Sequence, residues 1–152
     1  MNLKDQLNDD LKSAMRSGDD ARKSVIRLLR SAIHNEEKPG TREPIELDDD
    51  GVIGVLSRQA KQRRDSIDAF RQGGRQDLVD REEAELAIIA EYLPQQMTED
   101  EVRALATEAI DKVGATGPQE MGKVMGSLMP QVRGKADGKM VSGIVTELLK
   151  SL

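Results

Sequence analysis

The chain of 152 residues contains no cysteine, and this absence excludes several kinds of chemistry. Disulfides, thiolate nucleophiles and cysteine-ligated zinc sites all require a side chain that the sequence lacks. There is a single histidine, His34, so a pair of histidines cannot hold a metal and a Ser-His-Asp triad would have to use this residue. Phosphate-binding and dinucleotide-binding glycine motifs are also missing. We therefore predict no catalytic residues, no metal and no cofactor.

Aromatic residues are almost absent, with one Tyr, one Phe and no Trp, while hydrophobic residues make up 37% of the chain. The core must therefore be aliphatic, with the seven methionines filling irregular gaps. Aromatic and β-branched residues are the usual strand formers, and no segment alternates with a period of two. This composition predicts an all-α fold.

Long hydrophobic runs are absent as well. No apolar segment approaches the length that spans a membrane, and the N-terminal residues 1–5 lack the apolar core of a signal peptide. We expect a cytoplasmic protein without a membrane partner. The net charge of -5 also argues against a polycation that coats nucleic acid, so a nucleic-acid site would have to be a local patch.

Apolar residues at helical spacing predict about four helices before Pro94 and three after it. Residues 95–97 give the best domain boundary. We predict an N-terminal helical domain, residues 1–94, and a small three-helix C-terminal domain, residues 95–152. In the second domain, Thr98 and Glu101 form a capping-box pattern, and Pro130 is expected to end or kink the middle helix.

Charged segments in the first domain have structural explanations. The acidic run 48–50 is typical of a helix start rather than of a metal site. The most basic segment, residues 58–64, is followed by Asp65 and Asp68, which can pair with it. In the second helix, basic residues fall between the core positions, and we expect them to form a solvated face. These are Arg22, Lys23, Arg27, Arg30 and His34.

The least ordinary passage is residues 121–139. Gly122 and Gly126 lie four residues apart in a helical pattern with Lys123 between them, although each glycine in a helix interior costs about 1 kcal/mol relative to alanine. Two interpretations remain open. The glycines can admit a ligand close to the backbone, or they can allow two helices to pack closely beside solvated lysines.

A second glycine-bracketed basic loop follows, and residues 118–139 carry four basic residues against two acidic ones. Without aromatic residues this patch cannot stack bases, so it would read phosphates and riboses of a folded RNA by shape. The predicted RNA-binding residues are Gly122, Lys123, Gly126, Arg133, Lys135, Gly138 and Lys139.

Six passages of the sequence resemble the YqeY family, which is related to the C-terminal tail of the B subunit of the tRNA-dependent amidotransferase. They are Leu3–Leu7, Arg27–Ile33, Lys61–Ile67, Glu91–Gln96, Met121–Gly126 and Ala136–Lys139. The resemblance implies an all-helical protein of two domains whose tail contacts the outer body of tRNA. Lys135 stands where this family pattern has Arg, and lysine lacks the planar fork that binds a phosphate through two hydrogen bonds.

Three hypotheses follow. The first is a non-catalytic accessory protein that binds tRNA or a tRNA-charging complex. The alternative is a protein–protein adaptor whose apolar or Met-rich helix surfaces dock a partner. The third is a carbon–nitrogen ligase with glutamine as amido donor, as the family label suggests, although the chain lacks recognisable sites for ATP and ammonia. The sequence does not indicate an oligomeric state.

Overall fold

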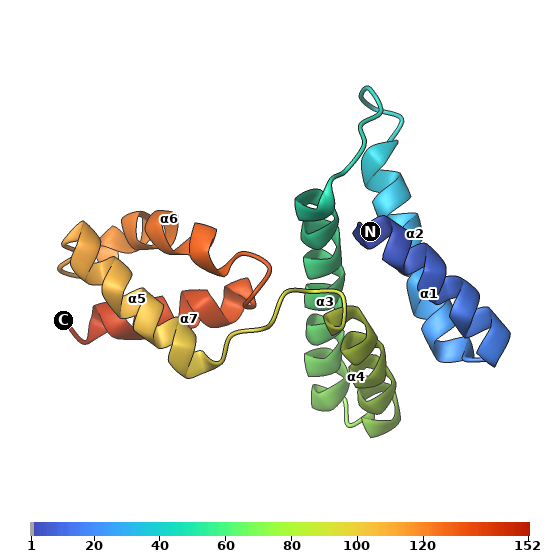
Figure 1. The fold of residues 1–152 in the computed structure, drawn as a ribbon. Helices are drawn as coiled ribbons and strands as arrows, with labels where there is room; N and C mark the ends of the chain where they lie inside the picture. Colours follow the sequence, from blue (N-terminus) through green and yellow to red (C-terminus); the bar gives the residue numbers. More distant parts are fainter. Residues whose placement is uncertain (1) are drawn as a thin grey trace. The chain divides into compact units, whose positions relative to one another are not determined.

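The computed structural model describes residues 2–152, which form seven α-helices and one short 3₁₀ helix (Figure 1). No strand occurs among these residues, so the predicted all-α class is confirmed. The contacts between Cα atoms divide the chain into two units, one ending at Leu93 and one that runs from Pro94 to Leu152. None of the helices in residues 2–152 is long and apolar enough to span a bilayer.

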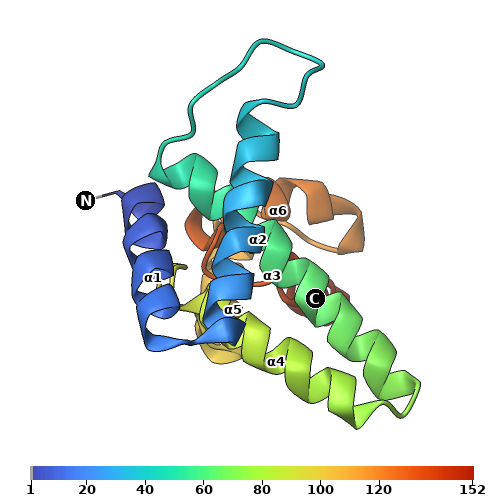
Figure 2. The same cartoon turned by 90° about the vertical axis from the view of Figure 1, so that its right-hand side faces the viewer.

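The N-terminal unit contains four helices, whose bounds are α1 (Leu3–Ser17), α2 (Asp20–Glu37), α3 (Asp49–Gln72) and α4 (Gln76–Ala90). The first two pack against each other, the last two form a second pair, and α2 contacts both α3 and α4 (Figure 2). Their apolar stripes meet in one core that is aliphatic except for a tyrosine. It consists of Leu7, Leu11, Val25, Ile26, Leu29, Ile33, Val52, Val55, Leu56, Ala60, Ile89 and Tyr92.

Two large apolar residues of the first two helices are exposed although they continue the apolar stripes. Met15 of α1 and Leu28 of α2 have 54% and 43% of their surfaces exposed. Each lies next to a buried stripe residue, Ala14 or Leu29, at the edge of the face that its helix presents to its neighbours. Helical spacing marks such edge positions as apolar but does not show how far the neighbouring helix extends over them.

Side-chain caps begin three of the four N-terminal helices. The Asp19 carboxylate accepts a hydrogen bond from the Arg22 N–H at 3.0 Å, and the Asp48 carboxylate accepts one from the Gly51 N–H at 2.9 Å. Asn2 caps α1 in the same way. Each cap satisfies a backbone donor that has no partner inside its helix. The acidic run 48–50 therefore serves the start of α3, as the sequence predicted.

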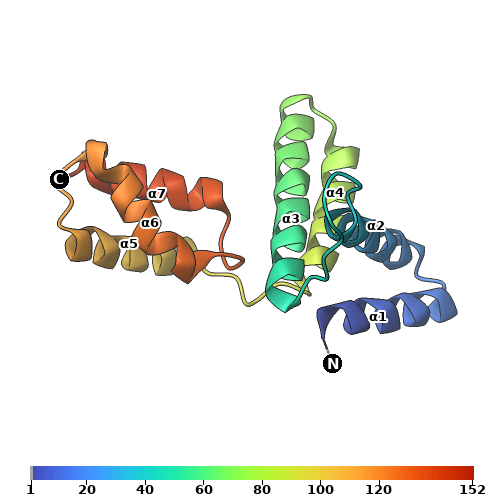
Figure 3. The same cartoon turned by 90° about the horizontal axis from the view of Figure 1, so that it is seen from above.

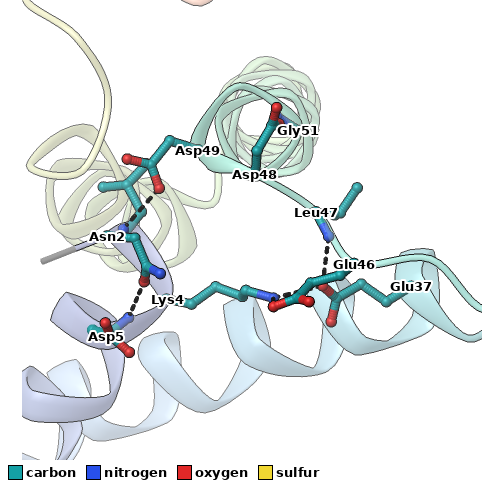
Figure 4. A network of polar contacts seen from close by, with 10 residues as sticks. Asn2, Lys4, Asp5, Glu37, Glu46, Leu47, Asp48, Asp49 and Gly51 are labelled. Atoms are coloured by element: carbon teal, nitrogen blue, oxygen red, sulfur yellow. Dashed lines mark hydrogen bonds and ion pairs between the residues drawn. The ribbon is translucent and has the colours of Figure 1, made fainter.

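A polar network fastens the 38–48 loop to α1 and α2 (Figure 4). The Glu37 carboxylate accepts hydrogen bonds from the Lys4 ammonium at 2.7 Å and from the Leu47 backbone N–H at 2.8 Å. At the other end of the loop, the Asp49 carboxylate accepts one from the Leu3 N–H at 3.0 Å. The start of α1 thus holds both ends of the α2–α3 connection.

The C-terminal unit contains three α-helices around its own aliphatic core (Figure 3). They are α5 (Glu99–Val113), α6 (Met121–Val132) and α7 (Gly138–Lys150), and the 3₁₀ turn η1 (Pro118–Glu120) precedes α6. The core residues are Val102, Ala106, Ala109, Ile110, Ala115, Val124, Leu128, Val132, Val141, Ile144, Val145 and Leu149.

Local signals place the ends of these helices. The Thr98 hydroxyl accepts a hydrogen bond from the Glu101 N–H, and Gly114 ends α5 in the left-handed conformation with φ of 69°. Pro130 lies inside α6, which continues to Val132. The helix thus ends within one turn of Pro130 but two residues beyond it. A proline in the last turn removes a single backbone donor, so the helix can continue briefly past it.

Candidate nucleic-acid interface

Gly122 and Gly126 lie on the solvent-facing side of α6, opposite the buried residues Val124 and Leu128. An added Cβ atom at either glycine would meet no neighbouring heavy atom within 4 Å. Within the C-terminal unit, these glycines therefore do not serve to bring two helices close together. They leave an open strip of helix backbone at the surface, where a ligand can come close.

Lys123 lies beside this strip, and its side chain is 70% exposed. Its ammonium is 3.9 Å from the Glu120 carboxylate, a loose pair one turn back along the chain. Glu120 itself accepts a hydrogen bond from the Thr116 backbone N–H, and this bond is the largest cause of its lowered pKa. Because Glu120 is held toward Thr116 and the ion pair with Lys123 is long, the lysine keeps most of its capacity to bind an anion.

The loop between α6 and α7 is anchored through its backbone. The Gln96 side-chain amide donates to the Gly134 carbonyl at 2.9 Å, and the Met97 N–H donates to the Lys135 carbonyl at 2.8 Å. Gly134 has a φ of 77°, a left-handed conformation that favours glycine. The segment that precedes α5 therefore binds two consecutive backbone carbonyls of this loop.

Arg133 and Lys135 are exposed on this anchored loop. No carboxylate within residues 2–152 forms an ion pair with either side chain. At 3.6 residues per turn, positions 122, 126 and 133 fall on one side of α6 and its C-terminal end. Arg133, the residue that ends α6, thus follows the helix on the same side as the open glycine strip.

The first turn of α7 follows the loop. The Asp137 carboxylate caps the helix by accepting a hydrogen bond from the Lys139 N–H at 3.3 Å. Gly138 and Lys139 are both exposed, and a Cβ atom added at Gly138 would also meet nothing within 4 Å. All seven predicted RNA-binding residues therefore lie at the surface of the C-terminal unit, along α6, the α6–α7 loop and the start of α7. Among them, the Lys123 side chain extends toward Glu120, at the start of α6.

The basic segment 58–64 of the N-terminal unit is largely neutralised by nearby carboxylates. Arg58 pairs with Glu36 at 3.4 Å, and Lys61 pairs with Asp65 at 2.9 Å. Arg63 is the least exposed of them and lies 3.1 Å from Glu82 as well as against Glu85. Arg64 is not free either. The segment with the highest density of positive charge thus supports the α3–α4 pair and leaves little charge for a ligand.

The second helix gives the opposite result. At its start the expected basic face is neutralised, because Arg22 pairs with Glu91 and Lys23 pairs with Asp20. Arg27, Arg30 and His34 are exposed further along α2, and no ion pair with them occurs within the described part of the chain. The sequence holds a signal for this difference. Neither arginine has an Asp or Glu three or four positions away.

No group of three or more His, Cys, Asp or Glu side chains in residues 2–152 could hold a metal ion.

The architecture is thus that of a helical protein with two units and a basic, glycine-lined surface on the second. Residues 4–149 match the family described as Yqey-like protein. Because this match spans nearly the whole sequence, the chain belongs to the Yqey-like protein family, as the resemblance in the sequence predicted.

Relatives of the chain carry the name "Altered inheritance of mitochondria protein 41, mitochondrial". The protein from Pyrenophora tritici-repentis is 33% identical over 147 residues, which cover 95% of this chain and 79% of the relative. The Lachancea thermotolerans protein is 38% identical over 74% of this chain and 60% of its own length. The Eremothecium gossypii protein is 40% identical over 57% of this chain and 46% of its own length.

These relatives contradict the expected cytoplasmic location, because each of them is named as a mitochondrial protein. The expectation was based on an N-terminus without an apolar core. The lack of an apolar core argues only against a secretory signal peptide, and it does not distinguish the cytoplasm from other compartments.

Proposed function

We propose that this protein is a non-catalytic accessory factor that binds tRNA, or a complex that charges tRNA, through the exposed surface of its C-terminal unit. The binding residues are those of the α6 glycine strip, the anchored α6–α7 loop and the first turn of α7. The proposed ligand group is the phosphate and ribose backbone of a folded RNA, because the surface offers cations and open backbone but no aromatic ring for stacking.

The observation that carries this proposal is the open environment of Gly122 and Gly126. Neither glycine is required by a left-handed backbone, and neither makes room for another helix. Their cost to helix stability therefore has no compensation within the C-terminal unit. Close approach of a ligand to α6 would supply that compensation, and Arg133 lies on the same side with its charge unopposed.

The N-terminus of α7 supports the same ligand class. The Asp137 carboxylate already accepts a hydrogen bond from the Lys139 N–H there, and the other N–H groups of the first turn and the positive end of the helix dipole favour an anion near Gly138. The loop that precedes it is held by Gln96 and Met97, so little conformational entropy would be lost when a phosphate binds there.

A binding titration with unfractionated tRNA across a salt series tests the proposal. We expect the affinity to fall as salt rises, and the Lys123→Glu/Lys135→Glu variant to lose most of it. Both side chains are exposed, so circular dichroism should show an unchanged helical content. A folded variant that binds tRNA like the unmodified protein would exclude this surface as the site.

The adaptor alternative is less well supported. It required Met-rich helix surfaces that are open to a partner, but Met121, Met125 and Met129 are partly buried against the C-terminal core. The large hydrophobic residues that are exposed in the described chain are Met15, Leu28, Ile45 and Leu152. Scattered residues of this kind are normal on protein surfaces and do not define a docking face.

A further inference from the structure

We infer that α2 carries a second RNA-backbone-binding surface, in the N-terminal unit, formed by Arg27, Arg30 and His34 with Ser31 and Asn35. The inference rests on the proposed function only for the choice of ligand. Its structural basis is independent, since it lies in the other unit of the chain and depends on a different set of contacts.

The five residues form one exposed stripe on α2. Arg27, Arg30, Ser31 and His34 recur at spacings of three and four residues, which places them on one side of a helix. Together with Asn35 they line an open hollow on the protein surface. The stripe thus combines two guanidinium groups, an imidazole, a hydroxyl and a side-chain amide, all of which can bond to phosphate or ribose oxygens.

Two carboxylates occur on α2 near this stripe, and each is already engaged elsewhere. Glu36 pairs with Arg58 of α3 at 3.4 Å. Glu37 lines a smaller hollow with Arg30 and His34, but its carboxylate accepts hydrogen bonds from the Lys4 ammonium and the Leu47 N–H. Figure 4 shows Glu37 turned toward these two donors. The positive charge of the stripe is therefore not compensated by its own helix.

The contrast with the neighbouring helix α3 makes this arrangement informative. Basic side chains of α3 pair with carboxylates of α2, α3 or α4, as Arg58, Lys61, Arg63 and Arg71 all do. Like charges three or four residues apart repel each other on a helix surface. In a chain with a net charge of -5, two neighbouring arginines without a partner indicate an anionic ligand rather than a general excess of positive charge.

The chemistry favours a phosphodiester backbone over an acidic peptide. Arginine offers a planar fork that binds phosphate through two hydrogen bonds, and Ser31 and Asn35 can bond to ribose hydroxyls. A bound peptide would need apolar anchors, and the only large exposed apolar side chain beside the stripe is Leu28 within the described residues. A stripe along one helix instead suits a ligand whose charges repeat along a chain.

The test uses the full-length protein and unfractionated tRNA across a salt series, with three pairs of substitutions. The test pair is Arg27→Gln/Arg30→Gln. The control pair is Arg71→Gln/Arg75→Gln, which removes the same charge from the same unit at arginines whose carboxylate partners, Glu83 and Asp77, lie on α4. The third pair, Lys123→Gln/Lys135→Gln, reports on the C-terminal surface. Circular dichroism verifies that each variant is folded.

We expect the test pair to weaken binding and to reduce the slope of log affinity against log salt by about 1.5, as two lost phosphate contacts predict. The control pair should leave the slope unchanged. A test pair that binds like the unmodified protein, or no more weakly than the control pair, would overturn the inference. The inference would also be overturned if poly-glutamate displaced labelled tRNA from the protein as well as unlabelled tRNA does at the same concentration of negative charge.

The third pair separates this inference from the proposed function. If the third pair retains full tRNA binding while the test pair loses binding, the result supports the α2 surface and contradicts the C-terminal surface. If the third pair loses tRNA binding while the test pair retains it, the result supports the C-terminal surface and contradicts the α2 surface.

Discussion

The Tyr92 hydroxyl donates a hydrogen bond to the Asp10 carboxylate across 82 residues of sequence. Tyr92 follows α4, Asp10 lies in α1, and the tyrosine is only 7% exposed. Burial is the main cause of the raised pKa of Tyr92, and its bond to Asp10 adds to it. Next to this contact, Glu91 pairs with Arg22 of α2. The segment after α4 is thus tied to both helices of the first pair.

The first prediction concerns this tie. Tyr92→Phe keeps the buried ring but leaves the Asp10 carboxylate without its donor, so we expect a loss of about 1 kcal/mol in the free energy of unfolding. Urea denaturation followed by circular dichroism measures it. Combining Tyr92→Phe with Asp10→Ala should cost less than the sum of the two single losses, because both changes remove the same bond. Strictly additive losses would show that the bond contributes nothing.

A second prediction concerns pH and the Lys4–Glu37 pair. The hydrogen bond from Lys4 is the largest cause that lowers the pKa of Glu37 below its ordinary value of 4.5, and the bond from the Leu47 N–H is the next. Glu37 in turn raises the pKa of Lys4 above 10.5. A lowered carboxylate pKa stabilises the fold above pH 4.5 and loses its effect as the pH falls through the folded-state pKa. The raised pKa of Lys4 stabilises the fold fully below pH 10.5, and this stabilisation is lost as the pH rises through the folded-state pKa of Lys4.

Glu37→Gln should therefore reduce the free energy of unfolding by about 1 kcal/mol at pH 7 and by less at pH 3. Urea titrations at the two pH values provide the comparison. Glu46→Gln is the control, because Glu46 is 90% exposed and lies 3.7 Å from the same ammonium. A Glu37→Gln deficit that stays constant from pH 7 to pH 3 would contradict the charge-based explanation.

Helix ends could be predicted well from the sequence because capping is local. Asp19, Thr98 and Asp137 each accept a hydrogen bond from a backbone N–H two or three residues ahead, so the signal and its partner lie within one turn. Exposure was harder to predict. Met15 and Leu28 fit the apolar stripes, but whether a neighbouring helix covers them depends on tertiary packing, which the helical period does not encode.

The pairing of charges shows the same limit. Lys61 and Asp65 are four residues apart, and their ion pair could be predicted from spacing. The partner of Arg63 is Glu82 on the next helix, and the partner of Arg58 is Glu36 on the previous one. Because these contacts depend on which helices are neighbours, the sequence indicated pairing with Asp65 and Asp68 but not with carboxylates of the other helices.

A third prediction tests whether the two units behave as independent domains, which we propose from the predicted boundary near residue 94. Leu128 is fully buried in the C-terminal core, so Leu128→Ala should cost about 2–5 kcal/mol. Hydrogen exchange should then accelerate in α5, α6 and α7 while α1–α4 keep their protection. Leu29→Ala, in the N-terminal core, should show the reverse pattern. Equal acceleration in both units for either variant would indicate a single cooperative unit.

The last prediction separates folding from binding at the α6 glycines. Both have helical backbone, and an added methyl group meets open space, so Gly122→Ala/Gly126→Ala should raise the free energy of unfolding by about 1–2 kcal/mol in total. If a ligand approaches the helix there, the same methyl groups should weaken tRNA binding. Loss of stability would instead mean that the glycines make room for a protein element.

Gly54→Ala is the matched control, because Gly54 lies inside α3 and its added Cβ would meet only the end of the Arg58 side chain at 3.9 Å. It should gain about 0.5–1 kcal/mol from the same helix propensity and leave tRNA binding unchanged. A more stable double variant with weaker binding, beside a more stable control with normal binding, would show that the α6 glycines are kept for contact with RNA. Unchanged binding in both would remove the main argument for the C-terminal site.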